Sequence, residues 1–231
     1  MTPDPDKLEL LDAILPQVAF DGWSETAFKA AIASTDIPDA RARSLCPRGA
    51  VDLAILFHKQ GDRAMAESLR SEDLSALRFR DKVARALRIR LDVIEDREAV
   101  RRGMTLFALP HLAADGARLM WGTADAIWTA LGDTSRDVNW YTKRATLSGV
   151  WSAVVLYWLG DQSEGTQKTT AFIDRRIDEV MQIERVKARL RDNPLLKPIT
   201  GPLGKLGGMI KAPMQMPDMD VPGLWRPGAP K

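Results

Sequence analysis

Apolar positions recur at steps of three and four residues along most of the chain, which is the period of amphipathic α-helices. Convincing two-residue alternation, β-branched blocks and hairpin dipeptides between apolar runs are absent from the sequence. The pattern therefore predicts an all-α fold of about nine helices. We expect them over residues 7–20, 24–34, 36–47, 50–69, 74–95 and 98–109, as two helices within 109–159, and over 165–191.

Aromatic residues are concentrated in the pair of helices within 109–159. This stretch holds five of the seven tryptophans and both tyrosines. In the second helix of the pair, large side chains follow one another at alternating steps of four and three and share one face: Trp140, Arg144, Leu147, Trp151, Val154 and Trp158. Such a stripe is most often core, and the alternatives are a second subunit, a partner protein or an apolar ligand.

The start of that second helix has the composition of an exposed anchor. Trp140 and Tyr141 are adjacent and follow the polar turn 132–135, so they cannot both face one core. Tryptophan and tyrosine at a helix end are side chains that protein interfaces favour. This end of the helix pair is therefore a candidate contact surface.

Composition narrows the possible classes of protein. The 231 residues suffice for one substantial core, and the 45% hydrophobic and 28% charged content is that of an ordinary soluble protein. The single cysteine excludes an intrachain disulfide framework, and two histidines exclude a His-rich metal site. We expect no metal, no cofactor and no catalytic residues.

The sequence carries no recognisable targeting or membrane-spanning segment. Its start is acidic and lacks both the apolar core of a signal peptide and the basic character of a transit peptide. No apolar run approaches the roughly 20 residues that span a bilayer. We therefore expect a cytoplasmic protein that is peripheral to the inner membrane.

The first three expected helices follow the long–short–short order of helix-turn-helix regulators, and the Gly22-Trp23 turn after the first resembles TetR-type proteins. DNA binding requires basic residues that contact phosphates. Residues 1–50 instead carry eight acidic and five basic side chains, a net charge of −3. We expect a degenerate helix-turn-helix region with no nucleic-acid partner.

Two other segments have charge patterns of interest. The helix expected over 74–95 is strongly basic, which is typical of a solvated face or, alternatively, of a patch for an acidic partner or anionic lipid. After residue 193 the chain is rich in Pro, Gly and Met, yet it holds a short amphipathic segment. The membrane-binding candidates there are Leu203, Lys205, Leu206, Ile210 and Lys211, and a disordered tail is the alternative.

The central residues resemble a known family. Leu109-Pro110-His111, Ala124-Asp125-Ala126-Ile127-Trp128 and the run from Gly132 to Ala145, with its Asn139-Trp140-Tyr141-Thr142, are similar to the signature of the coenzyme Q biosynthesis protein nine family. The resemblance extends from about residue 23 to 181. Two departures stand out: Arg101-Arg102-Gly103 replaces the family's Trp-Pro, and 164–170 replaces an acidic-aromatic segment.

The resemblance implies a TetR-like helical bundle that forms a homodimer and binds an isoprenoid or quinone lipid. It also implies a membrane surface and a ubiquinone-biosynthesis hydroxylase as partners. The residues that match the family's hydroxylase contact are Asp137, Trp140 and Tyr141. For the lipid cavity, our candidates are Trp121, Trp128, Trp151 and Trp158, for which ordinary core packing is the alternative.

We therefore predict a non-enzymatic, lipid-binding accessory protein of ubiquinone biosynthesis. Its expected organisation is a degenerate helix-turn-helix-like region at 1–50, a helical lipid-binding and dimerisation core at 51–192, and a membrane-touching or disordered tail at 193–231. A TetR-type ligand-responsive DNA-binding regulator is the alternative, and an interfacial scaffold without lipid ranks third.

Overall fold

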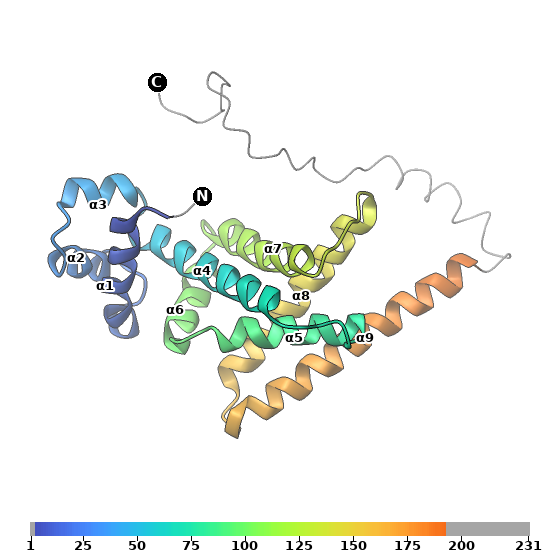
Figure 1. The fold of residues 1–231 in the computed structure, drawn as a ribbon. Coiled ribbons are helices and arrows are strands. Elements are labelled where there is room, and N and C mark those ends of the chain that lie inside the picture. The colour runs from blue at the N-terminus through green and yellow to red at the C-terminus, as the bar shows by residue number, and fades with distance from the viewer. Residues whose placement is uncertain (1–2, 193–231) are drawn as a thin grey trace, which may run out of the picture.

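The computed structural model describes residues 3–192, and in that part of the chain every regular element is helical (Figure 1). This confirms the predicted all-α class. The elements are α1 (Pro5–Asp21), α2 (Glu25–Ala33), α3 (Asp39–Leu45), α4 (Ala50–Ser71), α5 (Phe79–Asp92), α6 (Arg97–Phe107), α7 (Ala113–Ala130), α8 (Val138–Gly160), the short 3-10 turn η1 (Glu164–Thr166) and α9 (Gln167–Asp192).

Short polar side chains define where several helices begin. Ser24 Oγ accepts a hydrogen bond from the Ala27 amide at 3.1 Å and is the N-cap of α2. Asp96 Oδ1 accepts from the Ala99 amide at 2.8 Å at the start of α6. These bonds satisfy amides that have no partner inside their own helix.

The helices enclose two hydrophobic clusters. The first contains α1, α2, α3 and the beginning of α4, together with Ala99 of α6. The second is built by the rest of α4 with α5, α7, α8 and α9. In Figure 1 the first three helices lie at one end of the molecule, and α4 runs from them into the larger bundle. Because α4 contributes to both clusters, a cavity between the clusters is lined by residues of both.

Arginine side chains of helix α6 connect the N-terminal helices to the larger bundle. Arg102 donates to the Ala19 carbonyl at 2.9 Å, near the end of α1. Arg97 and Arg101 donate to the carbonyls of Asp161 (2.9 Å) and Leu159 (3.0 Å), at the end of α8. Carbonyls at a helix C-terminus lack partners within the helix and favour positive charge, so α6 stabilises two helix ends at once.

The basic helix differs from its prediction in length and in surroundings. It starts at Phe79, because Asp73 Oδ1 accepts from the Ser75 amide at 2.9 Å and holds the preceding residues in a turn. Leu77, which falls within the expected helix but precedes the observed one, is therefore 38% exposed. The arginines of α5 pair with acidic residues of α4, α9 and the segment between α4 and α5, so the face is neutralised within the protein. The pairs are Arg80–Asp178, Arg85–Glu72, Arg88–Asp174 and Arg90–Asp62.

The face of α8 matches its prediction closely. The five other residues of the stripe are all buried, and Trp140 at the start of the helix is half-buried; the buried residues are Arg144, Leu147, Trp151, Val154 and Trp158.

None of the described helices is long and apolar enough to cross a membrane. The proposed membrane-binding residues Leu203, Lys205, Leu206, Ile210 and Lys211 lie outside the described residues.

Candidate functional site

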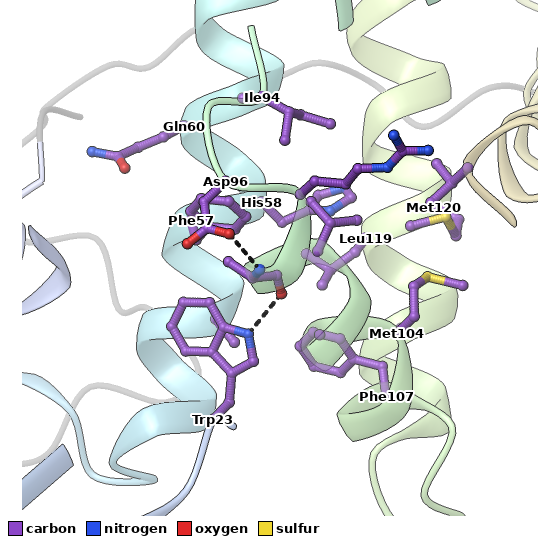
Figure 2. A pocket seen from close by; sticks show the side chains of 18 of the residues that line it. Trp23, Phe57, His58, Gln60, Ile94, Asp96, Met104, Phe107, Leu119 and Met120 are labelled. Carbon is purple, nitrogen blue, oxygen red and sulfur yellow. Dashed lines mark hydrogen bonds between the residues drawn. The ribbon is translucent and has the colours of Figure 1, made fainter. Parts of the chain in front are cut away.

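A cavity of about 720 Å³ lies where the two hydrophobic clusters meet. Its wall is made by residues of α1, α4, α5, α6, α7 and α8, of the turn between α1 and α2 and of the segment that follows α5. Figure 2 shows large apolar side chains converging on this space, among them Trp23, Phe57, Met104, Phe107, Leu119 and Met120. A mainly apolar space of this size is typical of pockets that hold a small organic ligand.

Trp23 forms a rigid part of the wall on the N-terminal side. Its indole Nε1 donates to the Ala99 carbonyl of α6 at 3.0 Å (Figure 2). Its ring lies 5.7 Å from that of Phe57, measured between centroids. Since Trp23 belongs to the N-terminal cluster, a molecule in the cavity would contact both parts of the protein.

One side of the cavity is polar, and it is built around the buried guanidinium of Arg90. Arg90 Nε donates to Asp62 Oδ1 at 2.8 Å, and Nη2 donates to the His58 carbonyl at 3.0 Å. Gly61 permits this arrangement, because a Cβ at that position would lie 2.4 Å from Arg90 Nη1. His58 and Arg90 line the cavity, and Asp62 joins them from the same face of α4.

The imidazole of His58 extends this polar group toward α7. His58 Nε2 lies 2.9 Å from the hydroxyl of Thr123, and that hydroxyl donates to Asp62 Oδ1 at 2.8 Å. Burial lowers the pKa of His58 to about 4, although the Asp62 carboxylate and the Leu119 carbonyl favour the charged form. The imidazole is therefore neutral at pH 7.

Sequence reasoning did not find this polar group. A signal was present, because His58 and Asp62 are one helical turn apart on α4, with a glycine between them. Sequence spacing could not reveal the partners of these two residues, because Arg90 and Thr123 are 28 and 61 residues away from Asp62.

The structure separates the four tryptophans expected to line a lipid cavity. Trp151 lines the cavity, and the Arg90 guanidinium lies 5.5 Å from the centre of its ring. Trp128 lines a second, smaller pocket of about 250 Å³ between α5, α8 and α9. Trp158 is buried beneath Arg97 at 4.6 Å, and Trp121 packs with the aromatic residues at the start of α8.

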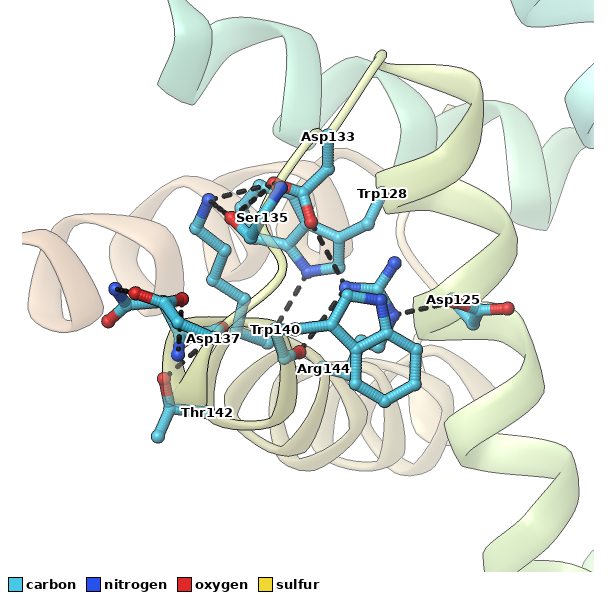
Figure 3. Close-up of polar contacts among 10 residues, drawn as sticks. Asp125, Trp128, Asp133, Ser135, Asp137, Trp140, Thr142 and Arg144 are labelled. Atoms are coloured by element: carbon cyan, nitrogen blue, oxygen red, sulfur yellow. Dashed lines mark hydrogen bonds and ion pairs between the residues drawn. The ribbon is translucent and has the colours of Figure 1, made fainter. Parts of the chain in front are cut away.

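Three aromatic rings form a partly exposed group where α7 and α8 meet, which we call the aromatic surface: Trp121, Trp140 and Tyr141. Trp140 lies 5.9 Å from Trp121 and 4.8 Å from Tyr141, the latter edge to face. Asp137, the third residue expected to contact a partner, caps α8 by accepting from the Asn139 amide at 3.0 Å. The structure thus places Asp137 on the same turn as the aromatic surface (Figure 3).

A buried arginine, Arg144, supports the aromatic surface by packing against the ring of Trp140. Arg144 donates to Asp125 at 2.5 Å and to Asp133 at 3.0 Å, and its guanidinium lies 4.0 Å from the centre of the Trp140 ring (Figure 3). Burial alone would raise the pKa of Asp133, but hydrogen bonds from Lys143, Ser135 and Arg144 outweigh it and lower the pKa to about 2. The turn between α7 and α8 is therefore held in one conformation by charge.

In the region predicted to be a degenerate helix-turn-helix, the arginines of α3 are already paired with acidic side chains. Arg41 donates to Asp4 at 2.7 Å and to Asp6 at 2.9 Å. Arg43, on the same helix α3, donates to Glu25 at 2.9 Å. Phosphate contacts need available basic side chains, so this surface does not favour DNA.

Metal and thiol chemistry find no support in the described part of the chain. Within residues 3–192, no group of three or more His, Cys, Asp or Glu side chains is placed to hold a metal ion. Cys46 is buried, and burial raises the pKa of its thiol to about 11. A thiol that stays protonated is a poor nucleophile.

Comparison with known proteins gives a consistent result. Residues 113–184 match the family model described as COQ9. Ubiquinone biosynthesis protein COQ9-A, mitochondrial, of Xenopus laevis is 30% identical over 184 residues, which cover 75% of this chain and 57% of the relative. Ubiquinone biosynthesis protein COQ9, mitochondrial, of Homo sapiens is 27% identical over 185 residues, covering 75% and 57%. The chain therefore spans less than two thirds of the length of these relatives.

A solved structure supports the predicted architecture. A TetR transcriptional regulator from Nitrosomonas europaea superposes with a TM-score of 0.62 at 17% identity, covering 76% of this chain and 98% of that one. This confirms a TetR-like fold. With the family match and the paired arginines of α3, the comparisons do not favour a DNA-binding regulator.

Proposed function

From the match of residues 113–184 to the COQ9 family model and the similarity to COQ9 relatives, we propose that the chain is a member of this family and a non-enzymatic accessory protein of ubiquinone biosynthesis. In this proposal it binds an isoprenoid quinone intermediate and presents it to a hydroxylase at the membrane surface. We further propose that it acts as a homodimer, with the segment around residues 203–211 as its membrane contact.

The cavity is the observation that carries the proposal. It offers about 720 Å³ bounded mainly by large apolar side chains. Moving an isoprenoid chain from water into such a space is favourable by about 25 cal/mol per Å² of apolar surface buried. The rings of Trp151 and Trp23, which belong to the two different hydrophobic clusters, provide two large contact faces, so we centre the lipid site on these two residues.

The aromatic surface supports the second half of the proposal. Trp121 on α7 and Trp140 and Tyr141 at the start of α8 present partly exposed rings beside a turn that Arg144 and Asp133 hold in place. Rigid aromatic anchors give binding energy at a low entropic cost, which suits a docking site for a partner protein. We propose that the hydroxylase docks here, with Asp137 at the edge of the contact.

The decisive experiment is to extract the purified protein with organic solvent and to identify its lipids by mass spectrometry. We expect isoprenoid quinones or their precursors at a near-stoichiometric level. Ala64→Phe places a ring in the cavity and is expected to lose this lipid. Ala33→Phe makes the same change at an exposed position at the end of α2 and is the matched control.

Two outcomes would contradict the proposal. A folded protein that yields no lipid has no carrier function. Equal lipid content in Ala64→Phe and Ala33→Phe would mean that the lipid lies elsewhere, for example in the smaller pocket beside Trp128.

A further inference from the structure

The wall of the cavity contains an indole N–H that has no acceptor. Trp151 of α8 lines the cavity, and only 1% of its surface is exposed. Its Nε1 is covered and has no hydrogen-bond partner among the described residues. The indole of Trp23, by contrast, donates to the Ala99 carbonyl at 3.0 Å. The indole of Trp128 donates to the Lys143 carbonyl at 3.2 Å. Buried tryptophan N–H groups usually have such an acceptor, so Trp151 is the exception.

Trp151 also differs from the other covered nitrogens that have no partner in residues 3–192. Those are arginine Nε atoms, and each of these arginines donates through a second nitrogen: Arg80, Arg88, Arg97, Arg102 and Arg176. An indole has a single donor, so Trp151 is the one side chain of this group that makes no hydrogen bond at all. A covered donor without an acceptor is unfavourable, and a bound molecule that supplies an acceptor removes this penalty.

The charged group beside this ring cannot supply the acceptor. Arg90 places its guanidinium 5.5 Å from the centre of the Trp151 ring, and arginine can only donate hydrogen bonds. Arg90 lines the same cavity and carries a positive charge. This side of the cavity therefore favours an electron-rich atom that has free lone pairs.

The wall around Trp151 can adapt to such an atom. Because Nε1 is covered, contact with a ligand requires neighbouring side chains to shift. Met104 and Met120 belong to the same wall (Figure 2), and unbranched thioether side chains change shape easily. An oxygen that binds here displaces no hydrogen bond of the indole, since Trp151 Nε1 makes none with the described residues.

We propose that the cavity prefers a ligand with an acceptor oxygen on an apolar body, such as a prenylated quinone, and that Trp151 Nε1 donates a hydrogen bond to that oxygen. The inference rests on the proposed lipid-binding function and narrows it, because it assigns recognition of the oxygenated ring to one residue. It also orients the ligand: the oxygen lies beside α8, and the isoprenoid chain extends along Trp23 and Phe57. A polyprenyl hydrocarbon fills the same space but leaves the N–H without an acceptor.

The test compares 4-geranylacetophenone with its isopropenyl analogue, in which a C=CH₂ group replaces the C=O group. Both dissociation constants are measured by isothermal titration calorimetry with the full chain, and their ratio is the readout, because the shared geranyl body cancels. Trp151→Phe removes the N–H and keeps an aromatic ring. We expect it to lower the preference for the ketone about five- to tenfold, the value of one hydrogen bond.

Trp23→Phe is the matched control for the loss of an indole from the cavity. The N–H of Trp23 already donates to the Ala99 carbonyl, so this variant should weaken both ligands alike and leave their ratio unchanged. Circular dichroism of each variant checks that the helical fold is intact.

NMR spectra of the ¹⁵N-labelled, unmodified protein give a second readout. The assigned indole N–H signal of Trp151 should move further downfield with the ketone than with the isopropenyl analogue, because only the ketone accepts its proton. If Trp151→Phe does not fold, this signal decides alone.

The outcomes separate the inference from the proposed function. If both ligands bind but Trp151→Phe keeps the ratio, or the Trp151 signal moves equally with both, the inference is overturned and lipid binding stands. An equal change of ratio in Trp151→Phe and Trp23→Phe would also overturn it and would assign the effect to packing. Failure of both ligands to bind the unmodified protein would overturn the lipid-binding proposal and the inference together.

Discussion

The cavity wall and the turn between α7 and α8 contain the same arrangement of three side chains, but it plays a different part in each region. Each places a buried arginine against an aspartate and an indole ring: Arg90 with Asp62 and Trp151, and Arg144 with Asp133 and Trp140. At the turn, two carboxylates and a lysine complete the charges, and the network is closed. At the cavity, the hydrogen bonds run from Asp62 through Thr123 to the imidazole of His58, which lines the open space.

This difference indicates which region is structural and which is suited to chemistry. A closed ion network holds its surroundings in place, because every polar atom already has a partner. A network that ends at a cavity can be completed by a ligand. The arginine and aspartate alone therefore do not mark a binding site; what distinguishes the cavity is that Arg90 and His58 of its network line an open space.

The largest expected effect on the free energy of unfolding comes from replacing each of the two buried arginines, Arg144 and Arg90. Arg144→Leu removes one of the two cations that pair with Asp133, whose side chain is only 4% exposed, and the partner of Asp125, and should lower the free energy of unfolding by about 3–5 kcal/mol. Arg90→Leu strands the single carboxylate of Asp62, which is 13% exposed and keeps its bond from Thr123, so its cost should be smaller, about 2–3 kcal/mol.

Urea unfolding of both variants measures this difference. Equal losses, or a larger loss for Arg90→Leu, would mean that the turn is no more dependent on its arginine than the cavity wall is. In that case the distinction between a closed and an open network would fail.

The two regions should also respond to acid in different pH ranges. His58 has its pKa lowered from 6.5 to about 4, so the unfolded chain binds a proton that the native ring does not. Its stabilisation is complete above about pH 6.5 and is lost as the pH falls toward 4, by about 3 kcal/mol in total. The pKa of Asp133 is lowered from 3.8 to about 2, so its contribution is lost only below about pH 4.

Thermal unfolding between pH 7 and pH 4 isolates the histidine. In His58→Leu the slope of stability against pH over this range should flatten, whereas the decline below pH 4 should remain. An unchanged slope in the variant would show that His58 is already accessible to protons in the native cavity.

The sequence predicted the turn better than the cavity, for a physical reason. The stripe on α8 follows from spacing within one helix, and five of its six members are buried as that spacing requires. Arg144 belongs to the stripe, and its partner Asp133 is only 11 residues away, across a single turn. Local periodicity is therefore sufficient to locate this region.

The cavity depends on contacts that no local pattern contains. Its wall combines Trp23, Met104 and Trp151 from three distant parts of the chain, and its polar side joins residues up to 65 positions apart. The concentration of tryptophan in 109–159 directed attention to four indoles, of which only Trp151 faces this space. The strong charge of α5 was likewise taken for a surface feature, although Arg90 points inward.

The smallest effect on stability, and the sharpest on binding, is expected at the aromatic surface. Replacing Trp140 and Tyr141 together by Ala removes the ring above Arg144, which should cost about 1 kcal/mol of unfolding free energy and leave the closed network intact. Capture of the hydroxylase by the purified protein should nevertheless be lost, since aromatic anchors at the centre of an interface carry much of its energy. Phe20→Ala, which truncates a ring that is 83% exposed on α1, is the matched control and should capture normally. If the double variant also captures normally, the closed network supports a turn with no docking role, and the contrast between the two regions is one of structure alone.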